Sequence, residues 1–344
     1  MKQLITTCWA LLLLTVAAHS QDNAVKLVCV AFYNFENLFD TEDDPLTSDG
    51  EFTPQGSYHY TEEIYREKLD RLAEVVAQLG TELTPDGPAI LGVCEVENRK
   101  VLEDFVAHPR IAHRDYRIVH FESRDRRGID VALLYQQKYF EIQHAKNLPM
   151  ATRIVQGDTS WSRDILVVTG NLDGEPTAVL VNHWPSRRGG ELATAPLRNA
   201  AAMVNKRVVD SLAARGVRSI VMGDMNDDPV NESMRVVLDA QVKARRIKEG
   251  QMYNPMYDFY KRGMGTTAYR DAWSLFDQIV LSHHYVQATD GFRFYKARVF
   301  NKPWLVQKLG QYKGYPFRTY AGGTYLGGYS DHFPVYVFLV KDVQ

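Results

Sequence analysis

Cysteine is scarce in this chain, and long apolar runs are absent after its first twenty residues. Three cysteines among 344 residues leave little material for a disulfide framework. Beyond residue 20, no stretch reaches the roughly 18 to 20 apolar residues that a membrane-spanning helix needs. The sequence also lacks internal repeats, low-complexity tracts and linkers rich in proline or serine, so nothing in its composition marks a domain boundary.

What the chain contains is typical of a soluble globular protein. Hydrophobic residues make up 45% of the sequence and charged residues 24%, with a net charge of −2. A chain of this length and composition can bury a large core. We therefore expect a single domain after the leader described next.

The first twenty residues differ from the rest. Lys2 precedes a mostly apolar run, Leu4–Ala18, and small side chains lead to Ser20. This pattern predicts a secretory signal peptide over residues 1–20 that is cut after Ser20. We expect residues 21–344 to form one secreted or periplasmic domain, monomeric and without stable membrane association.

Two cysteines remain after the predicted cleavage, Cys29 and Cys94. Both lie in apolar, strand-like runs. A strand advances about 3.3 Å per residue, so Cys29 lies roughly 16 Å before Asn34, whereas Cys94 is adjacent to Glu95. If Asn34 and Glu95 meet at one site, the two sulfurs are too far apart to bond. The sequence predicts two buried free thiols.

The order of hydrophobic patterns predicts a mixed sheet or a pair of sheets with helices outside. Residues 62–79 read as a helix with one buried face, capped by Thr61, and a second helix is expected from about Pro196 to Ala214. The expected strands are Leu27–Phe35, Ala89–Glu95, Arg117–Phe121, Ile129–Tyr135, Ile165–Thr169, Thr177–His183, Ser219–Met222, Phe276–Leu281 and Phe333–Val340.

Polar side chains follow several of these strands, where a strand fixes position and a loop exposes the side chain. They supply carboxylates, amides and two histidines, and they occupy five places: Asn34 to Asn37, Glu95 to Asn98, His183 to Arg188, Asp224 to Asp228, and Asp277 with Asp331 and His332. Such an inventory suits Mg²⁺, with Mn²⁺ or Ca²⁺ as alternatives, because hard cations prefer oxygen ligands and zinc favours thiolates or clustered histidines. The implied chemistry is metal-assisted hydrolysis of a phosphate ester.

Two pairs carry a mechanism of their own. Asp224 and Asn226 alternate along an extended segment and so face the same side, where one can activate water and the other can fix water or a phosphate oxygen. A Gly-Asp-x-Asn sequence also suits a plain turn. Asp277 can fix the tautomer of His332 and support a charged ring.

The ordered set of motifs resembles the endonuclease/exonuclease/phosphatase family, which includes deoxyribonuclease I-like enzymes. The resemblance covers residues 25–342 and implies a four-layer αββα sandwich of two mixed sheets packed face to face. The motifs that carry it are Tyr33-Asn34, Val93-Cys94-Glu95, Asn182-His183, Gly223-Asp224-Met225-Asn226, Phe276-Asp277-Gln278 and Ser330-Asp331-His332.

The resemblance also implies a metal site. Glu95 would be the principal ligand, with Asn34 beside it and Asp331 as a further ligand of the metal or its water. Glu36 and Glu97 each follow a motif residue by two positions, and either could face the same site or serve a loop or helix cap.

The resemblance assigns catalytic roles to five residues. Asp224 would orient or deprotonate the attacking water, and Asn226 would hold the substrate phosphate. His332, paired with Asp277, would stabilise charge on the scissile phosphate, and His183 would lie on the leaving-group side. Abasic-site endonucleases have asparagine at this last position, which argues against a dedicated DNA repair enzyme.

Arginines near these motifs are candidate phosphate ligands, because a guanidinium can bind phosphate through two hydrogen bonds. Those expected to bind substrate are Arg127, Arg187 and Arg188. A solvated rim is the alternative interpretation for them.

Residues 291–330 hold seven basic side chains, no acidic ones and eleven aromatics. Cations that track a phosphate backbone and aromatic faces that stack bases are typical of nonspecific nucleic-acid binding. The leading hypothesis is an exported, low-specificity nuclease for DNA, with RNA as a second candidate substrate. If the aromatics instead pack the sheet, a phosphatase or sphingomyelinase-like phosphodiesterase is the alternative. A catalytically inactive binding module is the hypothesis from another class.

Overall fold

The computed structural model describes residues 24–155 and 158–343. The predicted signal peptide, residues 1–20, lies outside the described residues, so the leader and the domain limits stay predictions. Among the described residues, no helix is both long and apolar enough to cross a membrane.

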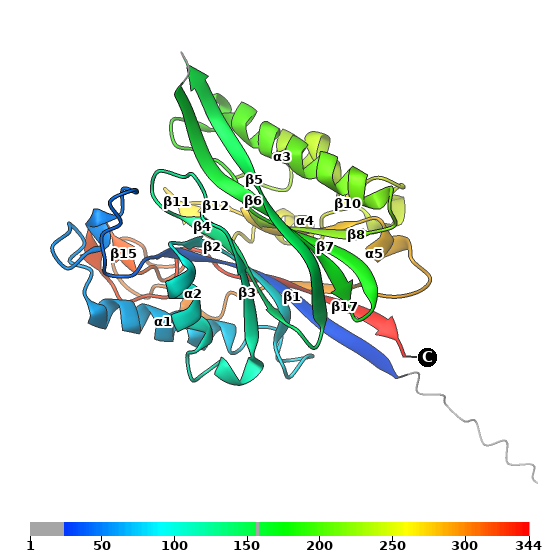
Figure 1. The fold of residues 1–344 in the computed structure, drawn as a ribbon, viewed down its shortest axis with the longest axis horizontal. Helices are drawn as coiled ribbons and strands as arrows, with labels where there is room; N and C mark the ends of the chain where they lie inside the picture. The colour runs from blue at the N-terminus through cyan, green and yellow to red at the C-terminus, as the bar shows by residue number, and fades with distance from the viewer. Residues whose placement is uncertain (1–23, 156–157, 344) are drawn as a thin grey trace, which may run out of the picture.

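Two large sheets form the centre of the described chain (Figure 1). The six-stranded sheet has the order β14 (Arg293–Val299), β17 (Val335–Asp342), β1 (Val25–Leu38), β2 (Pro88–Val96), β4 (Asp130–Gln136) and β3 (Tyr116–His120). The seven-stranded sheet has the order β5 (Phe140–Val155), β6 (Asp158–Leu172), β7 (Glu175–His183), β8 (Arg218–Asp224), β13 (Asp277–Ser282), β10 (Met252–Tyr253) and β9 (Ala240–Gln241). Both sheets mix parallel and antiparallel pairs.

Helices cover the outer faces of the two sheets (Figure 1). On one side lie α1 (Glu62–Val76) and α2 (Arg99–Val106), and on the other lies the long α3 (Glu191–Ala213). The α-helices α4 (Tyr257–Lys261) and α5 (His284–Gln287) are short. Further helical turns span Gly50–Phe52, Ala112–Arg114, Ser233–Val237, Ala244–Arg246 and Pro303–Leu305. Two small hairpins pair β11 (Thr267–Tyr269) with β12 (Ala272–Ser274) and β15 (Tyr320–Ala321) with β16 (Thr324–Tyr325).

The main core includes the space between the sheets. β1 and β2 pack against β7, β8 and β13 of the other sheet, and side chains such as Phe32 and Met222 are fully buried there. A second core lies between the seven-stranded sheet and α3, where Trp184 and Val209 are buried. This arrangement confirms the predicted αββα sandwich.

The two cysteines are free and buried, as predicted. The nine expected strands are all present, with shifted ends. The prediction missed β5 and β14, which are edge strands of their sheets and carry many polar side chains. It was also wrong about Pro196, which lies inside α3 because this helix begins five residues earlier, at Glu191.

Candidate active site

Three neighbouring strands of the seven-stranded sheet bring three predicted site residues into one row. His183 at the end of β7 lies directly opposite Asp224 at the end of β8. Asp224 in turn lies opposite Asp277 at the start of β13. Their side chains are nearly or fully buried. The row exists because β7 and β8 are parallel while β13 runs antiparallel, so two carboxyl ends meet one amino end.

The six-stranded sheet adds Asn34 and Glu95 from the neighbouring strands β1 and β2. The Asn34 side-chain nitrogen donates to Glu95 Oε1 (3.3 Å) and to Asp224 Oδ2 (3.2 Å). The second bond joins the two sheets at the site. Asn34 Oδ1 accepts the backbone N–H of Glu36 (2.8 Å). Asn34 therefore links the carboxylates of the two sheets, and its role as a metal ligand stays a prediction.

His332 is held by Asp277. Its Nδ1 lies 2.6 Å from Asp277 Oδ2, and its backbone N–H donates to the hydroxyl of Ser330 (3.1 Å). Burial alone would lower the pKa of His332, but the charge and hydrogen bond of Asp277, with the charges of Asp224 and Asp331, outweigh it and hold this pKa well above its usual value. The ring is therefore cationic at neutral pH, with Nε2 directed at Asp224 Oδ2 (3.9 Å).

Asp224 lies at the centre of the cluster. Burial raises its pKa to about 7, and the negative charges of Asp277 and Glu95 contribute in the same direction, while His332 opposes them. Its Oδ1 accepts the backbone N–H of Asn226 (2.9 Å). Asn226 has a left-handed backbone (φ 48°), as has Glu95 (φ 57°), a conformation that costs free energy in non-glycine residues and often occurs at functional sites.

His183 faces the same centre from the other side. Its Nε2 lies 3.7 Å from both Glu95 Oε1 and Asp224 Oδ2. Burial lowers its pKa well below the usual value, and the nearby cations Arg163, Arg127 and His332 lower it further. The imidazole is therefore neutral at neutral pH, in contrast with the cationic His332.

Arg163 was not predicted. It is buried beneath the site, where its guanidinium donates to the carbonyl of Trp184 (2.6 Å) and pairs with Asp125 (3.3 Å). Asn226 also donates to the Trp184 carbonyl (3.0 Å). Arg163 and Asn226 together therefore hold the chain that follows His183. The signal in the sequence was a single arginine between Ser162 and Asp164, just before an apolar run, which does not distinguish a site residue from a surface residue.

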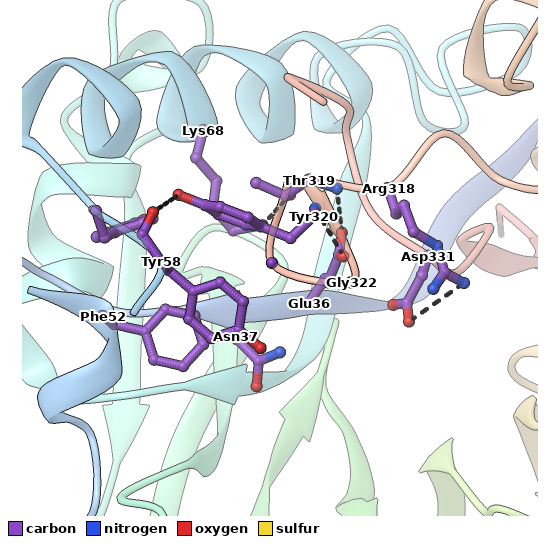
Figure 2. A pocket seen from close by; sticks show the side chains of 12 residues that line it. Glu36, Asn37, Phe52, Tyr58, Lys68, Arg318, Thr319, Tyr320, Gly322 and Asp331 are labelled. Carbon is purple, nitrogen blue, oxygen red and sulfur yellow. Dashed lines mark hydrogen bonds and ion pairs between the residues drawn. The ribbon is translucent and has the colours of Figure 1, made fainter. Parts of the chain in front are cut away.

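Asp331 lies at the rim of the cluster, with 30% of its side chain exposed. Its Oδ1 is 3.9 Å from His332 Nε2, and its Oδ2 is 3.9 Å from Arg318. Glu36 shares a cavity with it (Figure 2). Burial raises the pKa of Glu36 to about 7, with a contribution from the charge of Asp331. Glu97 faces elsewhere, accepting the backbone N–H of Asp40 (2.6 Å).

The residues present fit a divalent cation. Ligand atoms of Glu95, His183 and Asp224 lie within 4.8 Å of one another, as do those of Asp224, Asp277 and His332. Burial raises the pKa of Asp224, and the charges of Asp277 and Glu95 add to the effect; a cation bound by oxygen ligands would stabilise the ionised carboxylates. Glu95, whose side chain is 15% exposed, is the accessible carboxylate of the group.

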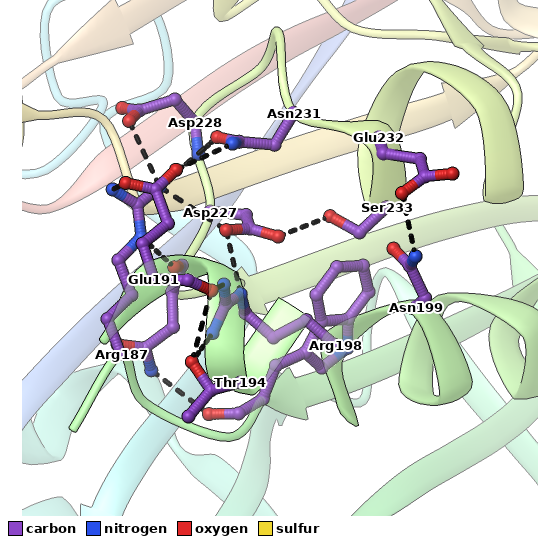
Figure 3. Close-up of polar contacts among 12 residues, drawn as sticks. Arg187, Glu191, Thr194, Arg198, Asn199, Asp227, Asp228, Asn231, Glu232 and Ser233 are labelled. Atoms are coloured by element: carbon purple, nitrogen blue, oxygen red, sulfur yellow. Dashed lines mark hydrogen bonds and ion pairs between the residues drawn. The ribbon is translucent and has the colours of Figure 1, made fainter. Parts of the chain in front are cut away.

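The three predicted substrate arginines have different surroundings. Arg187 is committed to the protein, since it donates to the backbone of Asn226 (2.9 Å) and to the Asp227–Asp228 turn, as Figure 3 shows in part. That it binds substrate stays a prediction. Arg127 is half exposed beside Asp125 and close enough to influence His183. Arg188 is exposed.

The solved structures that resemble this fold include three different proteins. They are zebrafish (D. rerio) TDP2 complexed with a single-stranded DNA product (12% identity, TM-score 0.54, 91% of this chain and 98% of that chain), the human Nocturnin catalytic domain (15%, 0.53, 92% and 94%) and a Bacteroides thetaiotaomicron mannosyl-6-phosphatase (16%, 0.53, 91% and 99%). At these identities the likeness establishes the fold alone. No curated protein matches the sequence.

The sequence profile of one family matches almost the whole chain. It spans residues 29–341 and is described as the endonuclease/exonuclease/phosphatase family. The match includes every strand that contributes to the site. The chain therefore belongs to the endonuclease/exonuclease/phosphatase family.

Proposed function

We propose that this protein is a magnesium-dependent hydrolase of phosphate esters. Members of its family hydrolyse phosphoester bonds with divalent metals. The observation that carries the proposal is the meeting of Glu95, His183, Asp224, Asp277 and His332 where the two sheets join. A buried site with one cationic and one neutral histidine around a shared carboxylate is arranged for proton transfer and charge stabilisation.

Asp224 suits the role of general base. Its pKa of about 7 lies near neutral pH, where a base combines a useful ionised fraction with proton affinity. In the reaction, Asp224 Oδ2 accepts a proton from water as the water oxygen attacks phosphorus on the side opposite the leaving group. The P–O bond to the leaving group breaks, and that oxygen takes up a proton.

The two histidines act on different oxygens. His332, cationic through Asp277, donates from Nε2 to a non-bridging phosphate oxygen and stabilises its growing charge. Neutral His183 offers a hydrogen bond to the leaving-group oxygen. A Mg²⁺ held by Glu95 with help from Asp331 would polarise the phosphate and neutralise charge.

A nucleic-acid substrate has partial support. Zebrafish TDP2, which shares the fold, carries a single-stranded DNA product, and residues 291–330 are basic. The aromatics of this segment do not form the expected stacking platform, however. Tyr315 and Tyr329 are buried, and Phe294, Trp304 and Phe317 pack against the core. Most of these rings instead pack against the sheet, which was the alternative interpretation of the sequence.

A small phosphate ester is the second candidate, and one observation favours it. A cavity of about 250 Å³ opens beside Asp331, and such a cavity suits a compact group better than a polymer. The B. thetaiotaomicron protein of the same fold is named a mannosyl-6-phosphatase. We also propose export after cleavage behind Ser20, which N-terminal sequencing of the protein recovered from the periplasm or medium would test.

Hydrolysis assays on four substrates test the proposal. Supercoiled plasmid, linear duplex, single-stranded RNA and phenyl phosphate are incubated with Mg²⁺, with and without chelator. We expect chelator-sensitive hydrolysis of at least one substrate, lost in His332→Ala and retained in His113→Ala, whose histidine is exposed on a helical turn. Plasmid nicking would identify a nuclease, whereas turnover of phenyl phosphate alone would exclude one. No turnover of any phosphate ester would refute the proposed function.

A further inference from the structure

A cavity lies directly beside the proposed active site, and the catalytic mechanism does not use it (Figure 2). We name it the Lys68 cavity. Its volume is about 250 Å³, just below the usual range for drug-sized ligands and suited to a single small ring. Its walls come from three parts of the chain: β1 and the segment after it, α1, and the loop around the β15–β16 hairpin. The lining residues are Glu36, Asn37, Phe52, Tyr58, Tyr60, Lys68, Arg318, Thr319, Tyr320, Gly322, Gly323 and Asp331.

The Lys68 cavity shares a wall with the active site. Asp331 lines the cavity and lies 3.9 Å from His332 Nε2. Asn37 lines it as well, and its backbone N–H donates to Glu95 Oε2 (3.0 Å). A group attached to a phosphate at His332 can therefore enter the cavity while the phosphate stays among the catalytic side chains.

Several donors in the cavity have unused capacity. Lys68 is 1% exposed, and within the described residues its ammonium makes one hydrogen bond, to Thr319 Oγ1 (2.6 Å). An ammonium has three donors. The Nε of Arg318 and the hydroxyl of fully buried Tyr60 have no hydrogen-bond partner in the described part of the chain. Buried polar groups are normally paired with protein, water or ligand, so these groups supply donors that a molecule in the cavity can satisfy.

Acceptors line the same space. Glu36 is 8% exposed and is held by the backbone N–H groups of Thr319 (2.7 Å) and Tyr320 (3.5 Å). With Asp331 it supplies two carboxylates that balance the two cations, Lys68 and Arg318. A second phosphate group in the cavity would meet both carboxylates as well as both cations, so the balanced charges of the lining do not favour an anion.

The remaining walls are aromatic. Phe52 stacks on Tyr58 with ring centroids 4.8 Å apart, and Tyr58 meets Tyr320 edge to face at 4.9 Å. The Tyr320 hydroxyl donates to the Tyr58 carbonyl (3.1 Å), which ties the hairpin to this wall. Aromatic rings offer flat apolar surface, while the opposite wall offers mixed donors and acceptors.

We propose that the Lys68 cavity binds a neutral, polyhydroxylated ring, such as a sugar, that is attached to the scissile phosphate. Each hydroxyl both donates and accepts, so a polyol can satisfy carboxylates and cations together, and the C–H face of the ring can lie against the aromatic wall. This inference rests on the proposed function, because it identifies the substrate class as a phosphorylated sugar or polyol.

Hydrolysis rates on a panel of substrates test the assignment. Hexose 6-phosphates, hexose 1-phosphates and inositol 1-phosphate are compared with phenyl phosphate and pyrophosphate for the wild type, Lys68→Met, Asn37→Gly and Lys100→Met. Lys68→Met removes the buried charge. Asn37→Gly removes only an amide, since glycine tolerates the left-handed backbone there (φ 53°). Lys100 is a lysine on α2 with 54% of its side chain exposed, and it serves as the matched control.

We expect at least one sugar phosphate to be preferred over phenyl phosphate and pyrophosphate. Its kcat/KM should fall about tenfold or more in Lys68→Met, relative to kcat/KM for phenyl phosphate, because a hydrogen bond to a buried charge is lost. Asn37→Gly should shift the same ratio in the same direction, and Lys100→Met should leave it unchanged. Equal losses on sugar and phenyl esters, or a preference for pyrophosphate, would overturn the assignment.

A binding measurement separates this inference from the proposed function. Saturation-transfer NMR with free hexoses and free inositol reports contact with the protein without any hydrolysis. We expect transfer to at least one of these polyols in the wild type and its loss in Lys68→Met. If phosphate esters are hydrolysed but no polyol binds, the cavity assignment fails alone. If a polyol binds but no ester is hydrolysed, the proposed function fails, and the cavity remains a polyol-binding site without an assigned reaction.

Discussion

His332 Nδ1 and Asp277 Oδ2 lie 2.6 Å apart, and Asp277 is the cross-strand partner of Asp224. One strand pair therefore supports both proposed catalytic groups, the acid that contacts phosphate and the base that accepts a proton from water. The two carboxylates stay distinct because Asp277 is paired with the imidazole, whereas Asp224 meets it only at 3.9 Å. Replacing Asp277 should therefore change mainly the pKa of His332.

Asp277→Asn should shift the pH dependence of hydrolysis. The active form has protonated His332, whose pKa Asp277 holds well above the usual value, so wild-type activity is present at neutral pH and falls as pH rises through that pKa. Without the carboxylate the pKa drops, and the fall occurs at lower pH. We expect kcat to decline about 10²- to 10⁴-fold at neutral pH.

A pH–rate profile from pH 5 to 10 measures this effect, and NMR titration of the His332 ring locates the pKa directly. Asp271→Asn is the control, because this residue lies on the β11–β12 turn and pairs with Tyr315 instead. An unchanged alkaline limb in Asp277→Asn would contradict the assigned role of the pair.

Glu95→Gln should abolish stabilisation by Mg²⁺. Wild-type protein gains unfolding free energy when a cation binds the native site, about 2.7 kcal/mol at a metal concentration 100 times the Kd. The glutamine keeps the shape but removes the charge that makes the cluster attractive to a cation. Thermal denaturation with added Mg²⁺ and with chelator measures the difference, and Glu103→Gln, with 59% of the glutamate side chain exposed, is the control. A Mg²⁺-induced rise in Tm that survives in Glu95→Gln would place the metal elsewhere.

Both cysteines of the described chain should resist thiol reagents until the protein unfolds. Burial raises the pKa of Cys29 and of Cys94 well above the usual value, and the thiolate is the reactive form. Mass spectrometry of protein treated with iodoacetamide, resolved to the modified residue, should detect neither site in native protein and both in denaturant. Modification of Cys94 in the native protein would indicate that the strand next to Glu95 opens.

The catalytic cluster could be predicted from sequence because strand ends converge. An apolar run that ends or begins at a carboxylate or histidine predicts both the strand and a polar side chain at its end; His183 and Asp224 end such runs, and Asp277 precedes one. The direction of the Asn34 amide could not be predicted, because it depends on the backbone of Glu36 turning into the left-handed region (φ 48°).

Lys68 shows what a helical pattern can still reveal. It lies three residues after Tyr65 and four before Leu72, on the buried face of α1, and a lysine on such a face needs a polar partner. The pattern therefore signals a buried charge. Its partners could not be found from the sequence, because Thr319 lies 251 residues away and only the hairpin geometry brings it under α1.

Arg198→Met should destabilise the protein through the loop that carries Asn226. Arg198 is fully buried in α3, and its Nε lies 2.7 Å from Asp227 Oδ1 (Figure 3). Without Arg198, the buried Asp227 carboxylate keeps only Arg187, 3.3 Å away, as a cationic partner. We therefore expect a cost below the roughly 3 to 5 kcal/mol of a fully broken buried ion pair, on the order of 2 kcal/mol. Denaturation in urea measures the loss. Glu62→Ala, which breaks the exposed pair with Arg66, should change the unfolding free energy by at most about 1 kcal/mol.

The double variant Arg198→Met with Asp227→Asn separates charge from packing. If the cost of Arg198→Met comes from the charge of Asp227, which then has only Arg187 as a cationic partner, the double variant should recover part of the lost stability. Two other contacts hold the loop: the Ser233 hydroxyl donates to Asp227 Oδ2 (2.6 Å), and the Gln278 side chain donates to the Asp227 carbonyl (2.7 Å). We therefore expect both variants to fold, so that their stabilities can be compared. A double variant no more stable than Arg198→Met would mean that the arginine acts by filling space. The position of Asn226, and with it kcat, should then be equally disturbed in both variants.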